Sequence, residues 1–164
     1  MSIKVSIGTP TANSYVSVAY ANTYFETREY SQSWSNILTS STGTLGATER
    51  KERLLRQATR ELDRNIRFNE NKYYGGDLNA TDYQALEFPR TSCLDANSDL
   101  YIPYEVMDAT CEQALWILER AMKKTTNEGV VVDRQTMSPE GLHQLRYWAN
   151  RQVDMVGSYS WDNG

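Results

Sequence analysis

The stretch of sequence that decides the fold is Pro103–Lys124, which reads PYEVMDATCEQALWILERAMKK. Proline fits the first turn of a helix, where its missing N–H costs nothing, and the acidic Glu105 lies near the positive end of the same helix. Apolar side chains then recur at helical spacing and extend most of the way round, which is typical of a helix at the centre of its domain. The sequence therefore predicts a central helix over residues 103–125. Its predicted core positions are Val106, Ala114, Trp116 and Ile117.

A second amphipathic helix is predicted over residues 48–65. Thr48 is a residue type that caps helix N-termini, and the acidic Glu49 and Glu52 follow it near the positive end. The predicted core face, which spans roughly a third of a turn, consists of Leu54, Leu55, Ala58 and Leu62. The opposite side carries an arginine stripe that consists of Arg53, Arg56, Arg60, Arg64 and Arg67.

The arginine stripe has two interpretations. In the first it is a solvated face, partly neutralised through i,i+4 pairs with Glu49, Glu52, Glu61 and Asp63. In the second it contacts phosphates or an acidic partner. Residues 49–72 hold eight basic and five acidic side chains, so the basic excess is modest and both interpretations stay open.

The other segments before the central helix are shorter. Residues 3–7 alternate apolar and polar side chains and predict a short strand or an extended arm. Ser17 is a good N-cap for a helix that runs to about Tyr30. Residues 39–47 have the composition of a flexible loop, and a helical turn is expected around residues 82–86.

The C-terminal third carries weaker signals. Residues 130–132 form a short strand candidate. Ser138 and Pro139 have the character of a cap and first turn, which predicts a last helix over residues 139–154, with a strand as the alternative.

Together these elements predict a mainly α fold. We expect a compact helical bundle with extended N-terminal and C-terminal arms, and with a short β-hairpin as an option. The 164 residues suit one domain with a single core. The predicted organisation is an N-terminal arm at residues 1–16, a helical domain at residues 17–154 and a C-terminal tail at residues 155–164.

Composition and residue types exclude several classes of function. The net charge of −4 argues against a general nucleic-acid binder held by bulk positive charge. No apolar run approaches the ~20 residues that span a bilayer. Cys93 and Cys111 are expected to be free and packed. His143 has no nucleophile at a suggestive spacing, and the sequence holds no metal-ligand cluster or phosphate loop, so we expect no enzymatic activity, metal or cofactor.

Tyrosine is unusually frequent among the aromatic residues. The chain has 11 Tyr and 4 Trp but only 3 Phe. Aromatic side chains with a polar end are common at protein–protein interfaces, because one edge is buried while the other stays wet. The composition slightly favours a role at interfaces over simple decoration of the surface.

Three stretches of the chain, in this order and spacing, resemble one family. The first covers residues 8–28 and includes ANSYVS, the second is LLRQATRELD at residues 54–63, and the third begins with QALEFPR at residues 84–90 and continues at residues 102–115. They resemble phage proteins often described as DnaT-like single-stranded DNA-binding proteins. Those proteins sit among phage structural genes and are similar in size and plan to head–tail connector, or head-completion, proteins.

The resemblance implies a structural protein of the virion neck, made in the cytoplasm of the host bacterium. Such an adaptor docks under the portal protein as a ring, usually of about twelve copies, and joins the capsid to a tail-side neck or tail protein. Its partners would be the portal protein, that tail-side protein, other copies of itself and the packaged DNA. In such a ring the arginine stripe would face either the packaged DNA or an acidic neighbouring subunit. Chain ends that fold on docking suit such a role, and the candidate docking-arm residues of the tail are Tyr159 and Trp161.

The alternative is a phage-encoded single-stranded DNA-binding replication accessory protein. This activity usually needs aromatic stacking platforms along a positively charged groove. Phe68, Tyr73 and Tyr74, together with the arginine stripe, are the candidates for such a groove. The negative net charge counts against this reading.

Overall fold

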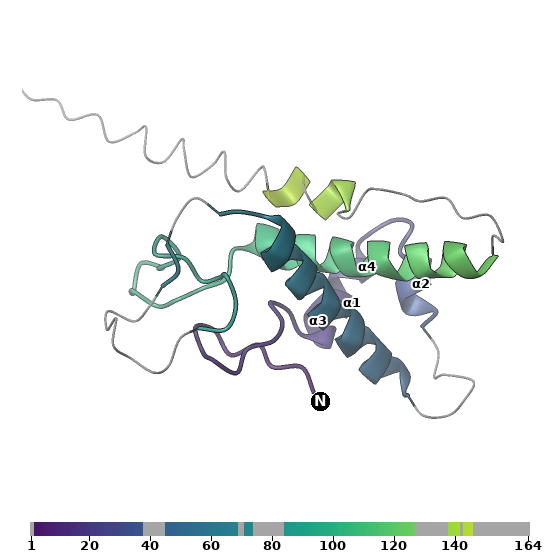
Figure 1. The fold of residues 1–164 in the computed structure, drawn as a ribbon, viewed down its shortest axis with the longest axis horizontal. Coiled ribbons are helices and arrows are strands. Elements are labelled where there is room, and N and C mark those ends of the chain that lie inside the picture. Colours follow the sequence, from purple (N-terminus) through teal and green to yellow (C-terminus); the bar gives the residue numbers. More distant parts are fainter. Residues whose placement is uncertain are drawn as a thin grey trace, which may run out of the picture.

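The computed structural model describes residues 2–37, 45–68, 71–73, 84–126, 138–141 and 143–145. Its helices are α1 (Val18–Glu26), α2 (Gln32–Ser35), α3 (Ala47–Asn65) and α4 (Tyr104–Thr126). Residues 139–141 and 143–145 are also helical. The described residues contain no strand, only two isolated bridges, so the fold is mainly α as the sequence predicts (Figure 1).

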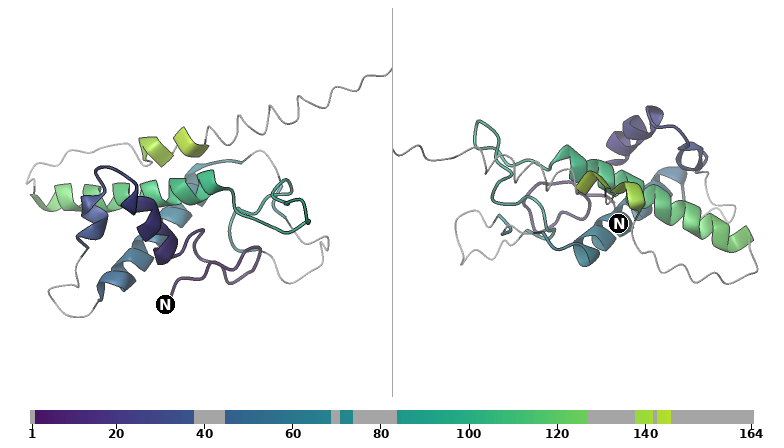
Figure 2. Two further views of the ribbon diagram at one scale, coloured as in Figure 1. Left: turned by 180° about the vertical axis from the view of Figure 1, so that it is seen from behind. Right: turned by 90° about the horizontal axis from the view of Figure 1, so that it is seen from above.

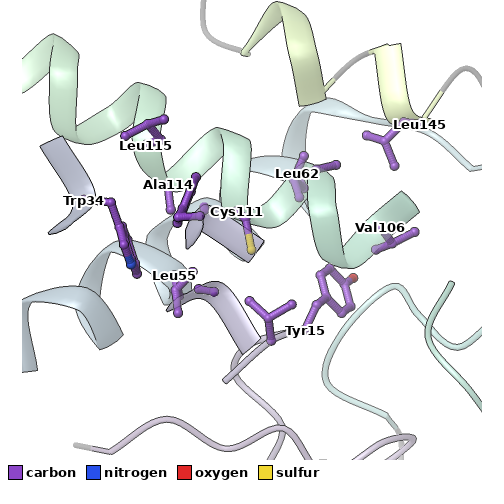
Figure 3. Packing of buried hydrophobic residues seen from close by; sticks show 14 of the residues in the cluster. Tyr15, Trp34, Leu55, Leu62, Val106, Cys111, Ala114, Leu115 and Leu145 are labelled. Atoms are coloured by element: carbon purple, nitrogen blue, oxygen red, sulfur yellow. The ribbon is translucent and has the colours of Figure 1, made fainter. Parts of the chain in front are cut away.

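The core forms where α3 crosses α4 (Figure 1). Small and branched side chains let the two helices approach closely. The predicted core residues that are almost inaccessible to water are Leu55, Ala58, Leu62, Val106 and Ala114. Figure 3 shows Leu55, Leu62, Val106 and Ala114 in this part of the core, together with Cys111 and Leu115. This part of the core prediction is confirmed.

Three predicted core residues are only half-buried. Leu54 and Ile117 pack against the edge of the core, and Trp116 lies outside the buried cluster. Most side chains of α4 from Glu105 to Leu115 are buried, whereas exposure increases from Trp116 onward. α4 continues past its crossing with α3 (Figure 1), and its second half is covered less completely, with α2 on one side, where Ser33 contacts Glu119. A helical wheel reports the direction of a side chain, not how far along the axis its neighbours reach.

α1 begins where the sequence predicts. The Ser17 hydroxyl accepts a hydrogen bond from the Tyr20 amide at 3.1 Å and caps the helix. The helix ends at Glu26, before the predicted end at Tyr30, which adopts a positive φ of 61° that no helix accommodates. α2, which follows at once, has no counterpart in the sequence-based prediction because its four residues are too few to show a period.

Tyrosine–carboxylate hydrogen bonds hold α1 against α4. The Tyr20 hydroxyl donates to Asp108 at 2.7 Å, and the Tyr24 hydroxyl donates to Glu112 at 2.6 Å. Arg28 adds an ion pair with Glu112 at 2.5 Å. Both tyrosines and both carboxylates are four residues apart, so successive turns of the two helices meet. These tyrosines therefore make contacts inside the chain, whereas the composition favoured contacts with partners.

The N-terminal segment folds back on itself and enters the core. The Lys4 amide donates to Asn13 Oδ1 at 2.8 Å, and the Asn13 amide donates to the Lys4 carbonyl at 2.9 Å. Gly8 makes the turn between them with a positive φ of 68°. Tyr15 and Val16, at the end of the segment, are 1% and 0% exposed. The segment is thus a folded-back loop rather than the strand or extended arm that the sequence predicts, and its last residues are part of the core.

The C-terminal helical segment, residues 138–145, begins where the sequence predicts and lies along α4 (Figures 1 and 2). The Ser138 hydroxyl accepts a hydrogen bond from the Gly141 amide at 3.1 Å, and the Ser138 amide donates to the buried Gln113 at 2.7 Å. A Cβ at Gly141 would lie 3.2 Å from a backbone oxygen of α4, so glycine permits this close approach. Leu145 reaches the core from this segment (Figure 3).

Other predicted boundaries differ or are untested. Gly46 is the N-cap of α3, so Thr48 lies in the first turn and does not cap it. The helical turn expected around residues 82–86 is not present in residues 84–86. The expectations that lie outside the described residues concern the loop at 39–44, the strand at 130–132, the helix at 146–154, and the tail with Tyr159 and Trp161.

Two expectations about composition agree with the structure. Cys93 and Cys111 are both buried and are not joined in a disulfide. None of the described helices combines the length and the apolar composition that crossing a bilayer requires.

Replacing Trp34 by alanine is expected to lower the free energy of unfolding by ~3–5 kcal/mol. Its side chain is 1% exposed, and its indole N–H donates to Asn22 at 3.0 Å. Trp116→Ala is the matched control and should cost about half as much or less, because a half-buried side chain leaves a smaller cavity. Chemical denaturation of both variants measures the difference, and equal losses would contradict this assignment of the core.

Candidate nucleic-acid interface

α3 presents two opposite faces. The buried face consists of Leu55, Ala58, Thr59 and Leu62. The solvent side carries the exposed Arg53, Arg60, Arg64 and Arg67, with Arg56 half-buried. The structure therefore places the predicted arginine stripe on the solvent side of α3, although Arg67 lies just beyond the end of the helix.

Two of the four acidic residues that the sequence offered as neutralising partners are engaged elsewhere. Glu61 accepts a hydrogen bond from the Gln113 side chain of α4 at 2.7 Å. Asp63 accepts hydrogen bonds from the Tyr15 hydroxyl and, at 3.3 Å, from the Glu87 amide. Both carboxylates thus hold α3 to other elements. The expected i,i+4 ion pairs with arginines do not form at Glu61 and Asp63, because that expectation considers only neighbours on the same helix.

Among the described residues, the second half of the arginine stripe has no direct neutralising partner. Arg53 pairs with Glu49 at 3.1 Å, one turn earlier. Within the described ranges, by contrast, no carboxylate lies within ion-pair distance of Arg60, Arg64 or Arg67. Arg60 donates to a backbone carbonyl at 3.3 Å, which leaves its charge in place. Position near a helix C-terminus stabilises such cations, but it does not neutralise them for a ligand. Exposed guanidinium groups of this kind suit phosphate oxygens.

Asp63 and Tyr15 hold the loop at residues 84–90 by hydrogen bonds to its backbone amides. The Tyr15 hydroxyl donates to Asp63 and accepts from the amides of Glu87 and Phe88 at 3.1 and 3.2 Å. The Tyr15 and Phe88 rings meet edge to face at 6.0 Å. Burial raises the pKa of the Asp63 carboxyl to about 6, although the hydrogen bonds from Tyr15 and the Glu87 amide act in the opposite direction.

The basic and aromatic residues near this loop already contact other side chains of the protein. Glu87 pairs with Lys72 at 2.7 Å and with Arg90 at 2.5 Å. The Arg90 guanidinium lies 5.1 Å from the centre of the Phe68 ring, whose other contact is an edge-to-face pair with Phe88 at 4.7 Å. Phe68 is therefore not an open stacking platform for a base. This weakens one of the aromatic candidates that the sequence offered.

Chemistry of other kinds finds no support in the described part of the chain. Its side chains include no group of three or more that would hold a metal ion. His143 is exposed on the C-terminal helical segment. The candidate site that remains is the arginine stripe.

The variant Asp63→Asn is expected to remove a pH dependence of stability. Because folding raises this pKa from 3.8 to about 6, the folded state holds the proton more tightly than the unfolded chain. The resulting stabilisation is complete below about pH 4 and is lost as the pH rises through about 6, amounting to about 3 kcal/mol at most. Urea unfolding of both proteins at several pH values measures it. Parallel curves for the two proteins would show that Asp63 does not titrate in this range.

Comparison with known proteins identifies the family of the chain. The family model described as "Putative DnaT-like ssDNA binding protein" matches residues 1–139, and no curated protein or solved structure matches the chain. The match is wider than the expected resemblance and includes α1 to α4 with the arginine stripe, whereas it lends no support to a head–tail adaptor. Because it spans most of the 164 residues, the chain belongs to the DnaT-like ssDNA binding protein family.

Proposed function

We propose that the protein binds single-stranded DNA and that the arginine stripe contacts the sugar–phosphate backbone. The observation that carries the proposal is the exposure of Arg60, Arg64 and Arg67 without a carboxylate partner among the described residues. They stay unneutralised because Glu61 and Asp63 bind other elements. The family description supports the same class of ligand.

The shape of the stripe suits a backbone that runs along α3. From Arg53 to Arg64 the helix advances about 16 Å, at about 1.5 Å per residue. Guanidinium groups in such a row reach successive phosphates, which position a strand without reading its bases. We therefore expect little sequence preference.

The negative overall charge of the protein does not contribute to the attraction for DNA. The net charge of −4 gives no long-range attraction for DNA, so the attraction comes from the local stripe alone. Contacts of this kind release counterions and weaken steeply with salt.

Fluorescence anisotropy of a labelled oligonucleotide tests the proposal. If three arginines each neutralise one phosphate, the slope of log K against log salt is about −2, since each contact contributes about 0.7. Arg64→Gln should weaken binding and reduce the slope by about 0.7. Lys4→Gln, which removes an exposed positive charge outside the stripe, is the matched control and should change neither. Binding that ignores salt, or that responds equally to both substitutions, would contradict the proposal.

A head–tail adaptor of a phage neck is the second candidate, and the composition of α3 favours it. None of residues 47–65 is aromatic, whereas proteins that bind single strands commonly stack bases on aromatic side chains beside the charged groove. A stripe that offers only phosphate contacts also suits double-stranded DNA packaged in a channel. In that setting, copies of the chain would form a ring under the portal protein.

Two measurements separate the candidates. One compares single-stranded and double-stranded oligonucleotides of equal length, and the other examines isolated portal rings mixed with the protein by electron microscopy. Tighter binding of the single strand, without a collar on the portal, supports the first candidate. A collar of regular symmetry, with no preference for single strands, supports the adaptor and removes the replication reading.

A further inference from the structure

The buried side chain of Gln113 on α4 links α3 to the C-terminal helical segment. Its Nε2–H donates to Glu61 Oε2 of α3 at 2.7 Å, and its Oε1 accepts a hydrogen bond from the Ser138 amide of the segment at 2.7 Å. α3 and the segment therefore meet α4 at the same place, although they are far apart in the sequence (Figure 1). The two ends of one side-chain amide serve both elements.

The docked segment protects the hydrogen bond between Gln113 and Glu61. The segment is held by its own cap from Ser138 to Gly141 at 3.1 Å, by the close approach of Gly141 to a backbone oxygen of α4, and by the buried Leu145. A hydrogen bond that is shielded from water is stronger than one that water can reach. Undocking of the segment would remove one partner of Gln113 and open its other bond to water.

Glu61 has an alternative partner on its own helix. The side chain is half-buried, and its Oε1 accepts a hydrogen bond from the exposed Gln57 at 3.0 Å, so it lies near the surface. Arg64 follows three residues later, which is a spacing at which ion pairs form on helices, and no carboxylate of the described chain is paired with it. A Glu61 carboxylate released by Gln113 would reach Arg64 and neutralise it.

We infer that Gln113 is a positioning residue that keeps Glu61 away from Arg64, and that docking of the C-terminal helical segment thereby sets the charge of the arginine stripe. The net charge of the chain stays at −4 in either arrangement, so only the local potential at α3 changes. The consequence for DNA binding rests on the proposed function, whereas the effect on Arg64 does not.

The first test follows the Arg64 Nε–H signal by NMR without DNA. Gln113→Met keeps the length of the side chain but removes both hydrogen bonds, and Gly141→Val pushes the segment away from α4 without changing a charge. Both variants should shift the Arg64 signal, because Glu61 then pairs with it. Adding Glu61→Gln to Gln113→Met should abolish the shift. Gln32→Met makes the matched change at an exposed position of α2 and should leave the signal in place.

The second test measures binding of a labelled single-stranded oligonucleotide. Gln113→Met and Gly141→Val should each raise the Kd by about threefold, which corresponds to one exposed ion pair. The slope of log K against log salt should become shallower by up to about 0.7, as expected for the loss of one phosphate contact. Gln32→Met should change neither quantity.

An unchanged Arg64 signal in both variants, with each shown to be folded by circular dichroism, would overturn the inference. A shift that persists after Glu61→Gln is added would do the same, and a shift in Gln113→Met alone would overturn the coupling to the segment. If the parent protein binds DNA as proposed while the variants bind equally well, the inference fails and the proposed function stands. If Arg64 shifts as expected but the parent protein binds no DNA, the proposed function fails and the assignment of Gln113 stands.

Discussion

The hydrogen bond between Tyr15 and Asp63 joins three parts of the chain that are far apart in the sequence. Tyr15 ends the N-terminal segment, Asp63 lies in the last turns of α3, and the Tyr15 hydroxyl also accepts the amides of Glu87 and Phe88. A buried tyrosine hydroxyl needs such partners, because desolvation without them is costly. Loss of this one side chain would remove a hydrogen bond from Asp63 and from the amides of Glu87 and Phe88 at the same time, although Asp63 and the Glu87 amide keep the bond between them. The attachment of the N-terminal segment and of the loop at residues 84–90 to α3 depends on this contact, whereas the core holds α3 against α4.

The same contact shapes the surface of α3. A carboxylate that holds the helix in place is not available to an arginine on its solvent side, and Glu61 is withdrawn in the same way by Gln113. Glu61 and Asp63 therefore anchor the helix, whereas Arg53, Arg60 and Arg64 are exposed to solvent. This division of charge gives a protein of negative net charge a local surface that suits phosphate groups. The anchoring of α3 and the exposed basic surface are two consequences of one arrangement of side chains.

The sequence predicts what depends on regular spacing along one helix. It gives the two long helices, most of their core positions and the placement of the arginine stripe, because amphipathic periodicity reports direction on a helix. It does not predict that Tyr15 is buried or that Asp63 points away from the arginines, since both depend on contacts 48 residues apart in the chain. The pairing of Tyr20 and Tyr24 with carboxylates of α4 left a usable signal, a matched spacing of four residues on both helices. The half-burial of Trp116 left no such signal in the sequence, because it depends on how the neighbouring elements cover that turn of α4.

The central claim is that DNA contacts Arg60, Arg64 and Arg67, which have no carboxylate partner among the described residues. The arginine Nε–H signals in an NMR titration with a single-stranded oligonucleotide test it most directly, because each guanidinium reports for itself. The signals of Arg60, Arg64 and Arg67 should shift together and saturate, while those of Arg28 and Arg90, which are held in ion pairs with carboxylates, should stay in place. Shifts confined to Arg28 or Arg90, or no arginine shift at all while the oligonucleotide is bound, would contradict it.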